Sequence, residues 1–180
     1  AHDSEDDRLL RAAGRGDERA FSRLVAAHGP RVHAIARRHL GSDAEADDVA
    51  QEVFWRVWKR ASQWRPGGAK FSTFLYRVTV NQCIDKARGR RAATPIDEAE
   101  EIADSGAGAE AELADRQTLR EMRQAIAALP ERQRLALVLS VQQQMPTKEI
   151  AAAMRISEGA VEQLLVRARR TLKERYGELT

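Results

Sequence analysis

The chain has 180 residues, a length that fits one large domain or two small ones, and its formal net charge is only +3. The charge is uneven, because residues 92–115 carry eight acidic side chains and no basic one, which leaves +11 on the other 156 residues. No apolar run is long enough to span a membrane, and the acidic N-terminal segment is unlike a secretory signal. A single cysteine excludes an internal disulfide and favours a reducing compartment.

The sequence gives little indication of an enzyme or a metalloprotein. The four histidines and one cysteine do not have the spacing of a structural zinc site. The sequence contains no glycine-rich phosphate loop, no Gly-x-Ser-x-Gly and no His-Glu-x-x-His. We therefore expect no catalytic centre, no metal and no cofactor.

Helical periodicity begins near the N-terminus. The apolar residues of segment 21–40 form a loose helical stripe, with Asp17 as a candidate N-cap. We expect Gly29–Pro30 to break or kink this segment. Segment 46–60 repeats its apolar residues at i, i+3, i+4 and i+7 without a miss, after stop and cap signals at Gly41–Asp43.

A loop and a further helix follow. The Pro-Gly-Gly core of segment 64–70 predicts a loop. Residues 71–88 then have helical periodicity, with Ser72 as a candidate cap and Gly89 as a candidate stop. Cys83 lies on the apolar stripe of this helix, which favours a packed side chain over a reactive thiol.

The second half begins after an acidic segment whose composition is that of a flexible linker, residues 92–112. Helical periodicity resumes at Leu113, and Pro130 fits the first turn of another helix. We predict an all-α fold of two small helical domains, residues 1–91 and 113–180, joined by this flexible acidic linker.

The last third of the chain has the pattern of a helix-turn-helix. Thr147 can cap a short helix over residues 148–154, residues 155–157 can form a tight turn, and Ser157 can cap a longer helix. The outer face of that longer helix offers groups that pair with base edges or phosphates in DNA, although a solvated helix of a small bundle is an alternative. The candidate residues are Ser157, Glu158, Glu162, Gln163, Val166, Arg167, Arg169 and Arg170.

A second candidate nucleic-acid surface lies around the loop at residue 70. Aromatic residues alternate there with basic ones, a composition that binds single strands by stacking and charge. The alternative, in which Phe71 and Phe74 are core residues and the arginines a solvated face, stays open. The candidate residues are Lys70, Phe71, Phe74, Tyr76, Arg77, Asn81 and Arg88.

Helix 46–60 has a different outer face. Acidic side chains beside an exposed tryptophan make poor nucleic-acid contacts but a reasonable protein-binding face. Part of this acidity also suits the positive end of the helix dipole. The candidate residues are Asp47, Asp48, Gln51, Glu52 and Trp55.

Together these stretches resemble the extracytoplasmic-function (ECF, group 4) sigma factors of bacterial RNA polymerase. The resemblance is carried by segments 17–25, 46–54 and 71–85, and by segment 129–134 with 149–161 and 167–169. They occur in the order and spacing of the family and span about residues 8 to 175.

The resemblance implies a sigma region 2 domain followed by a sigma region 4 domain. It implies that the acidic face docks on the clamp helices of the polymerase β′ subunit, with β as a further partner, and that the linker enters the nucleic-acid channels. Residues 70–88 would contact the melted −10 element and capture a flipped base, while the helix-turn-helix would read the −35 duplex. Control by an anti-sigma factor and a cytoplasmic bacterial location follow from the same resemblance.

Two departures and two alternatives accompany this interpretation. Many members of the family have a basic residue where this chain has Glu162, and loop 65–70 is individual, so no promoter sequence can be transferred. A stand-alone helix-turn-helix regulator would need a dimerisation or ligand domain, which the N-terminal half does not resemble. A sigma-like decoy that sequesters an anti-sigma factor could lose the basic DNA-facing residues, yet Arg77 and Arg167 are present.

Overall fold

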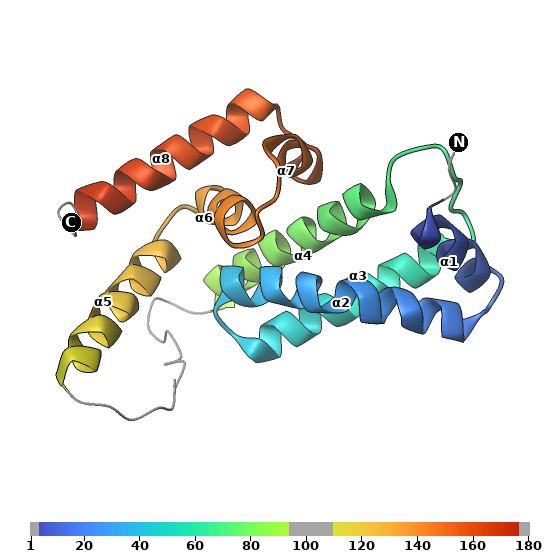
Figure 1. Ribbon diagram of the computed structural model, residues 1–180, viewed down its shortest axis with the longest axis horizontal. Coiled ribbons are helices and arrows are strands. Elements are labelled where there is room, and N and C mark those ends of the chain that lie inside the picture. The colour runs from blue at the N-terminus through green and yellow to red at the C-terminus, as the bar shows by residue number, and fades with distance from the viewer. Residues whose placement is uncertain (1–3, 94–109, 177–180) are drawn as a thin grey trace.

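The computed structural model describes residues 4–93 and 110–176, and the regular elements within these ranges are all helices (Figure 1). The N-terminal half contains α1 (Glu5–Gly14), α2 (Glu18–Leu40), α3 (Asp43–Ala61) and α4 (Phe71–Ala93). The C-terminal half contains α5 (Glu110–Ala127), α6 (Glu131–Leu137), the π-helical turn η1 (Val138–Gln142), α7 (Thr147–Met154) and α8 (Glu158–Tyr176). None of the helices in the described ranges is long and apolar enough to cross a membrane.

The predicted caps of α2 and α3 are confirmed. The carboxylate of Asp17 accepts hydrogen bonds from the backbone N–H groups of Arg19 and Ala20, at 3.0 and 3.1 Å. Gly41 ends α2 in the left-handed conformation at φ 76°, and the Ser42 hydroxyl then accepts from the N–H of Glu45. These side chains satisfy amides that have no partner inside their own helix, which fixes where each helix begins.

The expected break at Gly29–Pro30 is wrong, because α2 runs without interruption from Glu18 to Leu40. Leu24, before the proline, and Ile35, after it, are both fully buried. Helix α2 packs on α1 and α3, and its buried residues continue on both sides of the proline. This tertiary packing outweighs the local cost of the hydrogen bond that the proline removes.

Three other predicted boundaries differ from the structure. Helix α4 begins at Phe71, so Ser72 lies inside it, and it continues through Gly89 to Ala93. The guanidinium of Arg90 donates to the Leu40 carbonyl at 3.0 Å and pairs with Glu45, which holds the end of α4 against the α2–α3 corner. Helix α7 begins at Thr147 itself, after Pro146.

Helix α1 was not anticipated from the sequence. It begins with a capping box, in which the Ser4 hydroxyl accepts from the N–H of Asp7 and the Asp7 carboxylate accepts from the N–H of Ser4. Its buried face packs on α2 and α3. The N-terminal half is therefore a bundle of four helices.

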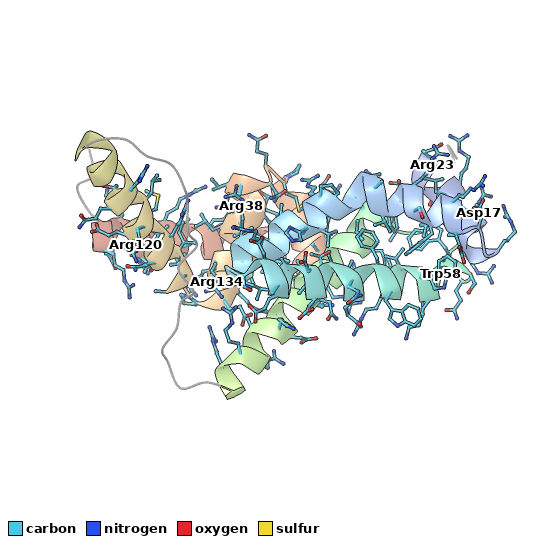
Figure 2. All side chains as sticks on the ribbon, turned by 90° about the horizontal axis from the view of Figure 1, so that it is seen from below. Asp17, Arg23, Arg38, Trp58, Arg120 and Arg134 are labelled. Atoms are coloured by element: carbon cyan, nitrogen blue, oxygen red, sulfur yellow. The ribbon has the colours of Figure 1, made fainter. Side chains whose placement is uncertain are left out.

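The two halves of the chain pack against each other. Helix α7 lies against α4, as Figure 1 shows, and η1 contacts α2. The guanidinium of Arg31 on α2 donates to the Gln143 carbonyl at 2.9 Å. In Figure 2, Arg134 lies where the α2–α4 bundle meets the C-terminal helices, whereas Trp58 lies toward the opposite end of the bundle. The two halves are therefore in contact, although the sequence separates them by an acidic segment and leaves a net positive charge on the rest of the chain.

Candidate protein-binding and nucleic-acid-binding surfaces

The acidic face of α3 forms an open hollow at the surface. Asp48, Gln51, Glu52 and Trp55 line it, and we call this set the acidic hollow. Asp47 is exposed on the same helix, close to the hollow in sequence. The structure thus brings all five predicted protein-binding residues to the surface of one helix, and the buried face of that helix, which includes Val49 and Val53, fixes their orientation.

Each carboxylate of this surface has a nitrogen-bearing side chain beside it, and for Asp48 and Glu52 that side chain is a cation. Asp47 Oδ1 lies 3.0 Å from His33 Nε2, Asp48 Oδ2 lies 2.9 Å from Lys86 Nζ, and Glu52 Oε1 lies 2.7 Å from Arg56 Nε. The ammonium of Lys59 lies 5.2 Å from the centre of the Trp55 ring. Exposed pairs of this kind contribute at most about 1 kcal/mol each. An incoming basic partner can therefore replace the local cations at little cost.

The candidates on the loop and α4 divide into exposed and buried groups. Lys70, Asn81 and Arg88 are exposed, whereas Phe71 is buried and Phe74 is half-buried. Phe71 packs edge-on against Trp64 and His28, at centroid distances of 6.0 and 5.2 Å, and Phe74 lies 5.8 Å from Trp64. The burial of Phe71 agrees with the alternative that the sequence left open.

Trp64 is anchored to α1 rather than free in the loop. Its indole Nε1 donates to Asp7 Oδ1 at 2.8 Å. Burial alone would raise the pKa of Asp7, but the hydrogen bonds from Trp64 and Ser4 lower it below its ordinary value. The ionised carboxylate thus links the loop before α4 to the first helix of the bundle.

Tyr76 and Arg77 face the C-terminal half. Tyr76 is buried beside the Arg31 guanidinium, which lies 5.1 Å from the ring centre, and burial raises the pKa of its hydroxyl. Arg77 donates from Nη2 to the Ala152 carbonyl of α7 at 3.4 Å. Its buried Nε has no partner among the described residues. In this arrangement α7 occupies the space next to the Arg77 guanidinium.

The helix-turn-helix is formed by α7, the turn at residues 155–157 and α8. Arg155 adopts the left-handed conformation at φ 55°, and the N–H of Ile156 donates to the Ala151 carbonyl at 3.1 Å. The Ser157 hydroxyl accepts from the N–H of Ala160 at 3.1 Å, which confirms the predicted cap. Val161, Leu165 and Ala168 are buried on the inner face of α8.

The residues predicted to contact duplex DNA lie on the exposed surface of α8, except Ser157, which caps the helix. All of these side chains are exposed: Ser157, Glu158, Glu162, Gln163, Val166, Arg167, Arg169 and Arg170. Among them Val166 is the most exposed large hydrophobic residue that the structure describes, at 60%. The face is acidic near the start of α8 and basic further along.

A polar cluster between the two halves was not anticipated from the sequence. The ring of His39 is buried, with Nε2 3.5 Å from Glu131 Oε1 of α6 and Nδ1 without a partner in the described part of the chain. Burial, together with the positive charges of Arg134, Arg90 and Arg91, lowers the pKa of His39 to about 3. Nothing in the pattern around His39 distinguishes it from the other histidines, because its burial depends on contacts with α6.

The fold is all-helical and has two parts, with candidate nucleic-acid-binding surfaces on α4 and α8 and a separate acidic surface on α3. Two family models match it: Sigma-70 region 2 over residues 24–93 and Sigma-70 region 4 over residues 119–172. Each match covers one of the two candidate nucleic-acid surfaces, and the first also covers the acidic hollow. The matches indicate a transcription initiation factor rather than an enzyme.

Similar proteins agree with these matches. The chain is 30% identical to the ECF RNA polymerase sigma factor SigM of Mycobacterium tuberculosis H37Rv, over 99% of this chain and 88% of that protein. It is 31% identical to the ECF RNA polymerase sigma-E factor of Escherichia coli K12, over 97% and 95% of the two chains. A structure of CnrH in complex with the cytosolic domain of CnrY matches with a TM-score of 0.72 and 28% identity, over 98% of this chain and 100% of that one. The chain belongs to the ECF sigma factors of the sigma-70 family.

Proposed function

We propose that this sigma factor binds core RNA polymerase through the acidic hollow and Asp47, and directs it to promoters through two DNA-binding surfaces. The observation that carries the proposal is the distribution of these surfaces. The acidic residues lie together on α3, and the base-reading candidates lie together on the outer face of α8. A protein partner and duplex DNA can therefore be bound at once through different helices.

The N-terminal unit, residues 1–91, is proposed to act as sigma region 2. Asp47, Asp48, Gln51, Glu52 and Trp55 would dock on the clamp helices of the β′ subunit, where exposed carboxylates and an indole can meet a basic, partly apolar surface. Lys70, Asn81 and Arg88 are exposed and would contact the melted −10 strand directly.

The remaining −10 candidates are proposed to act in two other ways. The buried residues would shape the base pocket from the core, and Arg77 would contact DNA after α4 separates from α7. Phe71 and Tyr76 would support the shape of the base pocket from the core, beside the half-buried Phe74. Arg77 would reach the DNA only after its hydrogen bond to Ala152 is broken. Promoter melting then depends on separation of α4 from α7.

The C-terminal unit, residues 113–180, is proposed to act as sigma region 4 and to read the −35 element as duplex, with residues 92–112 as the connecting linker. The exposed arginines Arg167, Arg169 and Arg170 would supply both base and phosphate contacts. Binding through such contacts weakens steeply as salt concentration rises, because it releases counterions from the DNA.

Regulation by an anti-sigma factor and a cytoplasmic location complete the proposal. The observation that supports regulation is that a structure 28% identical to this chain is a complex, that of CnrH with the cytosolic domain of CnrY. A second similar structure is the complex of the Bartonella quintana sigma factor RpoE with the anti-sigma factor NepR. The second is 19% identical and therefore supports the fold alone. A partner of this kind would keep the factor from core polymerase until a signal releases it.

The experiment that tests the proposal is capture of core polymerase by the tagged, full-length chain. The variant Asp48→Arg with Gln51→Ala reverses one charge and shortens one side chain within the acidic hollow, and should abolish capture. The variant Asp43→Asn changes an exposed acid at the start of the same helix, outside the hollow, and should capture core normally. Unchanged capture by the double variant, with a helical circular dichroism spectrum like that of the wild type, would rule out docking through this surface.

A further inference from the structure

One row of side chains on α8 changes character along its length. Glu158, Glu162, Val166 and Arg170 follow one another at intervals of four residues, and all are exposed. Residues at this spacing lie on the same face of a helix. Arg170 has a distant ionic neighbour in Glu174, at 3.9 Å, but Glu162 has no hydrogen bond or ion pair with any residue that the structure describes.

The fold gives no reason for Glu162 to be acidic. Glu158 lies in the first turn of α8, where the helix dipole stabilises a carboxylate. Glu162 lies beyond that turn and four residues after another glutamate, a pairing that costs a few tenths of a kcal/mol in isolated helices. A carboxylate in this position would also be repelled by DNA phosphates. Its favourable contacts with DNA are therefore limited to base edges.

Val166 is equally unexplained by packing. It is 60% exposed, one turn after Glu162, and the inner face of the helix is formed by other residues. A β-branched residue in an exposed helical position lowers helix propensity slightly and contributes little buried area. Its apolar surface gains most where another apolar group covers it.

The major groove of DNA supplies one partner for each side chain. A carboxylate accepts a hydrogen bond from the N4 amino group of cytosine, and an apolar side chain packs on the C5 methyl group of thymine. Recognition helices place the residues of their N-terminal half against base edges, which is where these two residues lie. Four helical residues rise about 6 Å, the length of one to two base-pair steps of about 3.4 Å.

We infer that Glu162 and Val166 are specificity-determining residues of this chain, and that they select a cytosine and a thymine one or two base pairs apart within the −35 element. The inference rests on the proposed function, in which α8 reads the −35 duplex. It assigns one base preference to Glu162, where many members of the family have a basic residue, and another to the exposed Val166.

The test uses holoenzyme assembled from the full chain and core polymerase, transcribing a promoter library with a randomised −35 region. Sequencing of the active templates should show a cytosine and, within two base pairs, a thymine. Glu162→Gln should reduce the cytosine preference about tenfold and leave the thymine preference intact. Val166→Ala should reduce the thymine preference about fourfold and leave the cytosine preference intact.

A second measurement isolates the methyl group. Replacing the selected thymine by uracil removes only the C5 methyl, and should lower transcription by the wild type about fourfold while leaving Val166→Ala unaffected. Two control variants match the changes in charge and size. Glu174→Gln removes a carboxylate from the other end of α8, and Val141→Ala shortens another exposed valine, on η1. Neither should change the base preferences.

The outcomes separate the inference from the proposed function. If Glu162→Gln and Val166→Ala select the same −35 sequences as the wild type, the inference is overturned, while −35-dependent transcription still supports the proposed function. If the wild type selects no −35 sequence at all, the assignment of α8 as the −35 reader fails, and the inference fails with it.

Discussion

At the scale of single residues, His39 shows how the packing of the two halves sets the chemistry of a side chain. The imidazole comes from α2, and the groups that surround it come from α4 and α6. Burial and three arginines oppose protonation, while the Glu131 carboxylate, at 3.5 Å, is too distant to form a strong hydrogen bond. The ring therefore stays neutral in the folded chain, with a pKa of about 3.

This lowered pKa predicts that stability depends on pH. Between about pH 3 and pH 6.5 the unfolded chain binds a proton at His39 and the folded chain does not, so this stability is complete above pH 6.5 and is lost as the pH falls. Lowering the pH from 7 to 5 should reduce the free energy of unfolding by about 2 kcal/mol through this residue. Urea unfolding followed by circular dichroism measures the change.

The variant His39→Asn serves as the control, because its side chain is neutral at every pH. Other groups titrate equally in both proteins, so the difference between the two pH profiles isolates His39. Parallel profiles for the wild type and the variant would contradict the assignment of a buried, neutral imidazole.

At the scale of helices, two glycines have opposite structural roles. A Cβ on Gly14 would lie 2.6 Å from the Ala61 carbonyl oxygen, so the close approach of α1 to α3 requires glycine there. A Cβ on Gly29 would meet only Phe54 and Val25 side-chain atoms, at 3.8 Å, which is ordinary contact. Gly14→Ala should therefore destabilise the chain by about 1–3 kcal/mol, and Gly29→Ala should stabilise it by about 1 kcal/mol.

Urea midpoints of the two variants, each compared with the wild type, test this pair of predictions. The same substitution is made at both positions, so the change in helix propensity is similar. The difference between the two changes in stability therefore reflects the space available for a Cβ at each glycine. A stabilising Gly14→Ala would show that α1 does not pack closely on α3.

The same scale shows what the sequence could and could not predict. The stripe of α3 and the caps at Asp17, Ser42 and Ser157 depend on neighbouring residues, and the sequence predicted them correctly. The sequence predicts a helix break at Pro30 and a helix end at Gly89, because the local cost of proline and glycine in a helix depends on these residues alone. The packing that outweighs this cost comes from residues distant along the chain, which no local pattern reveals.

At the scale of the whole molecule, the packing of the two halves was the feature furthest from prediction. Two of its hydrogen bonds end on backbone carbonyl groups, those of Gln143 and Ala152, which any residue could supply. The exposed candidates on α3 and α8 could be predicted, because the apolar stripe of an amphipathic helix shows in the sequence which residues lie on the opposite, exposed face. The hydrogen bond of Arg77 could not be predicted, because its acceptor lies on α7, distant along the chain.

This packing makes a prediction about the active complex. By the position numbers in their names, the −10 and −35 elements lie about 25 base pairs apart, which is about 85 Å at about 3.4 Å per base pair. Under the proposed function α4 contacts one element and α8 contacts the other. An α4 surface hydrogen-bonded to α7 does not allow both contacts, so we expect the two halves to separate on the promoter. Dyes on cysteines placed at the exposed Arg38, on α2, and at the exposed Gln142, on η1, which contacts α2, should show high energy transfer in the free chain and low transfer in the promoter complex.

The native cysteine should not interfere with this labelling. Cys83 is fully buried, and burial, together with the nearby Glu131 carboxylate, raises the pKa of its thiol to about 12, so little reactive thiolate forms at neutral pH. Singly labelled chains control for quenching by the polymerase, and core polymerase without DNA shows whether protein binding alone separates the halves. Equal energy transfer in the free chain and in a transcribing complex would mean that one packed arrangement serves both states, and that Arg77 does not contact the −10 strand.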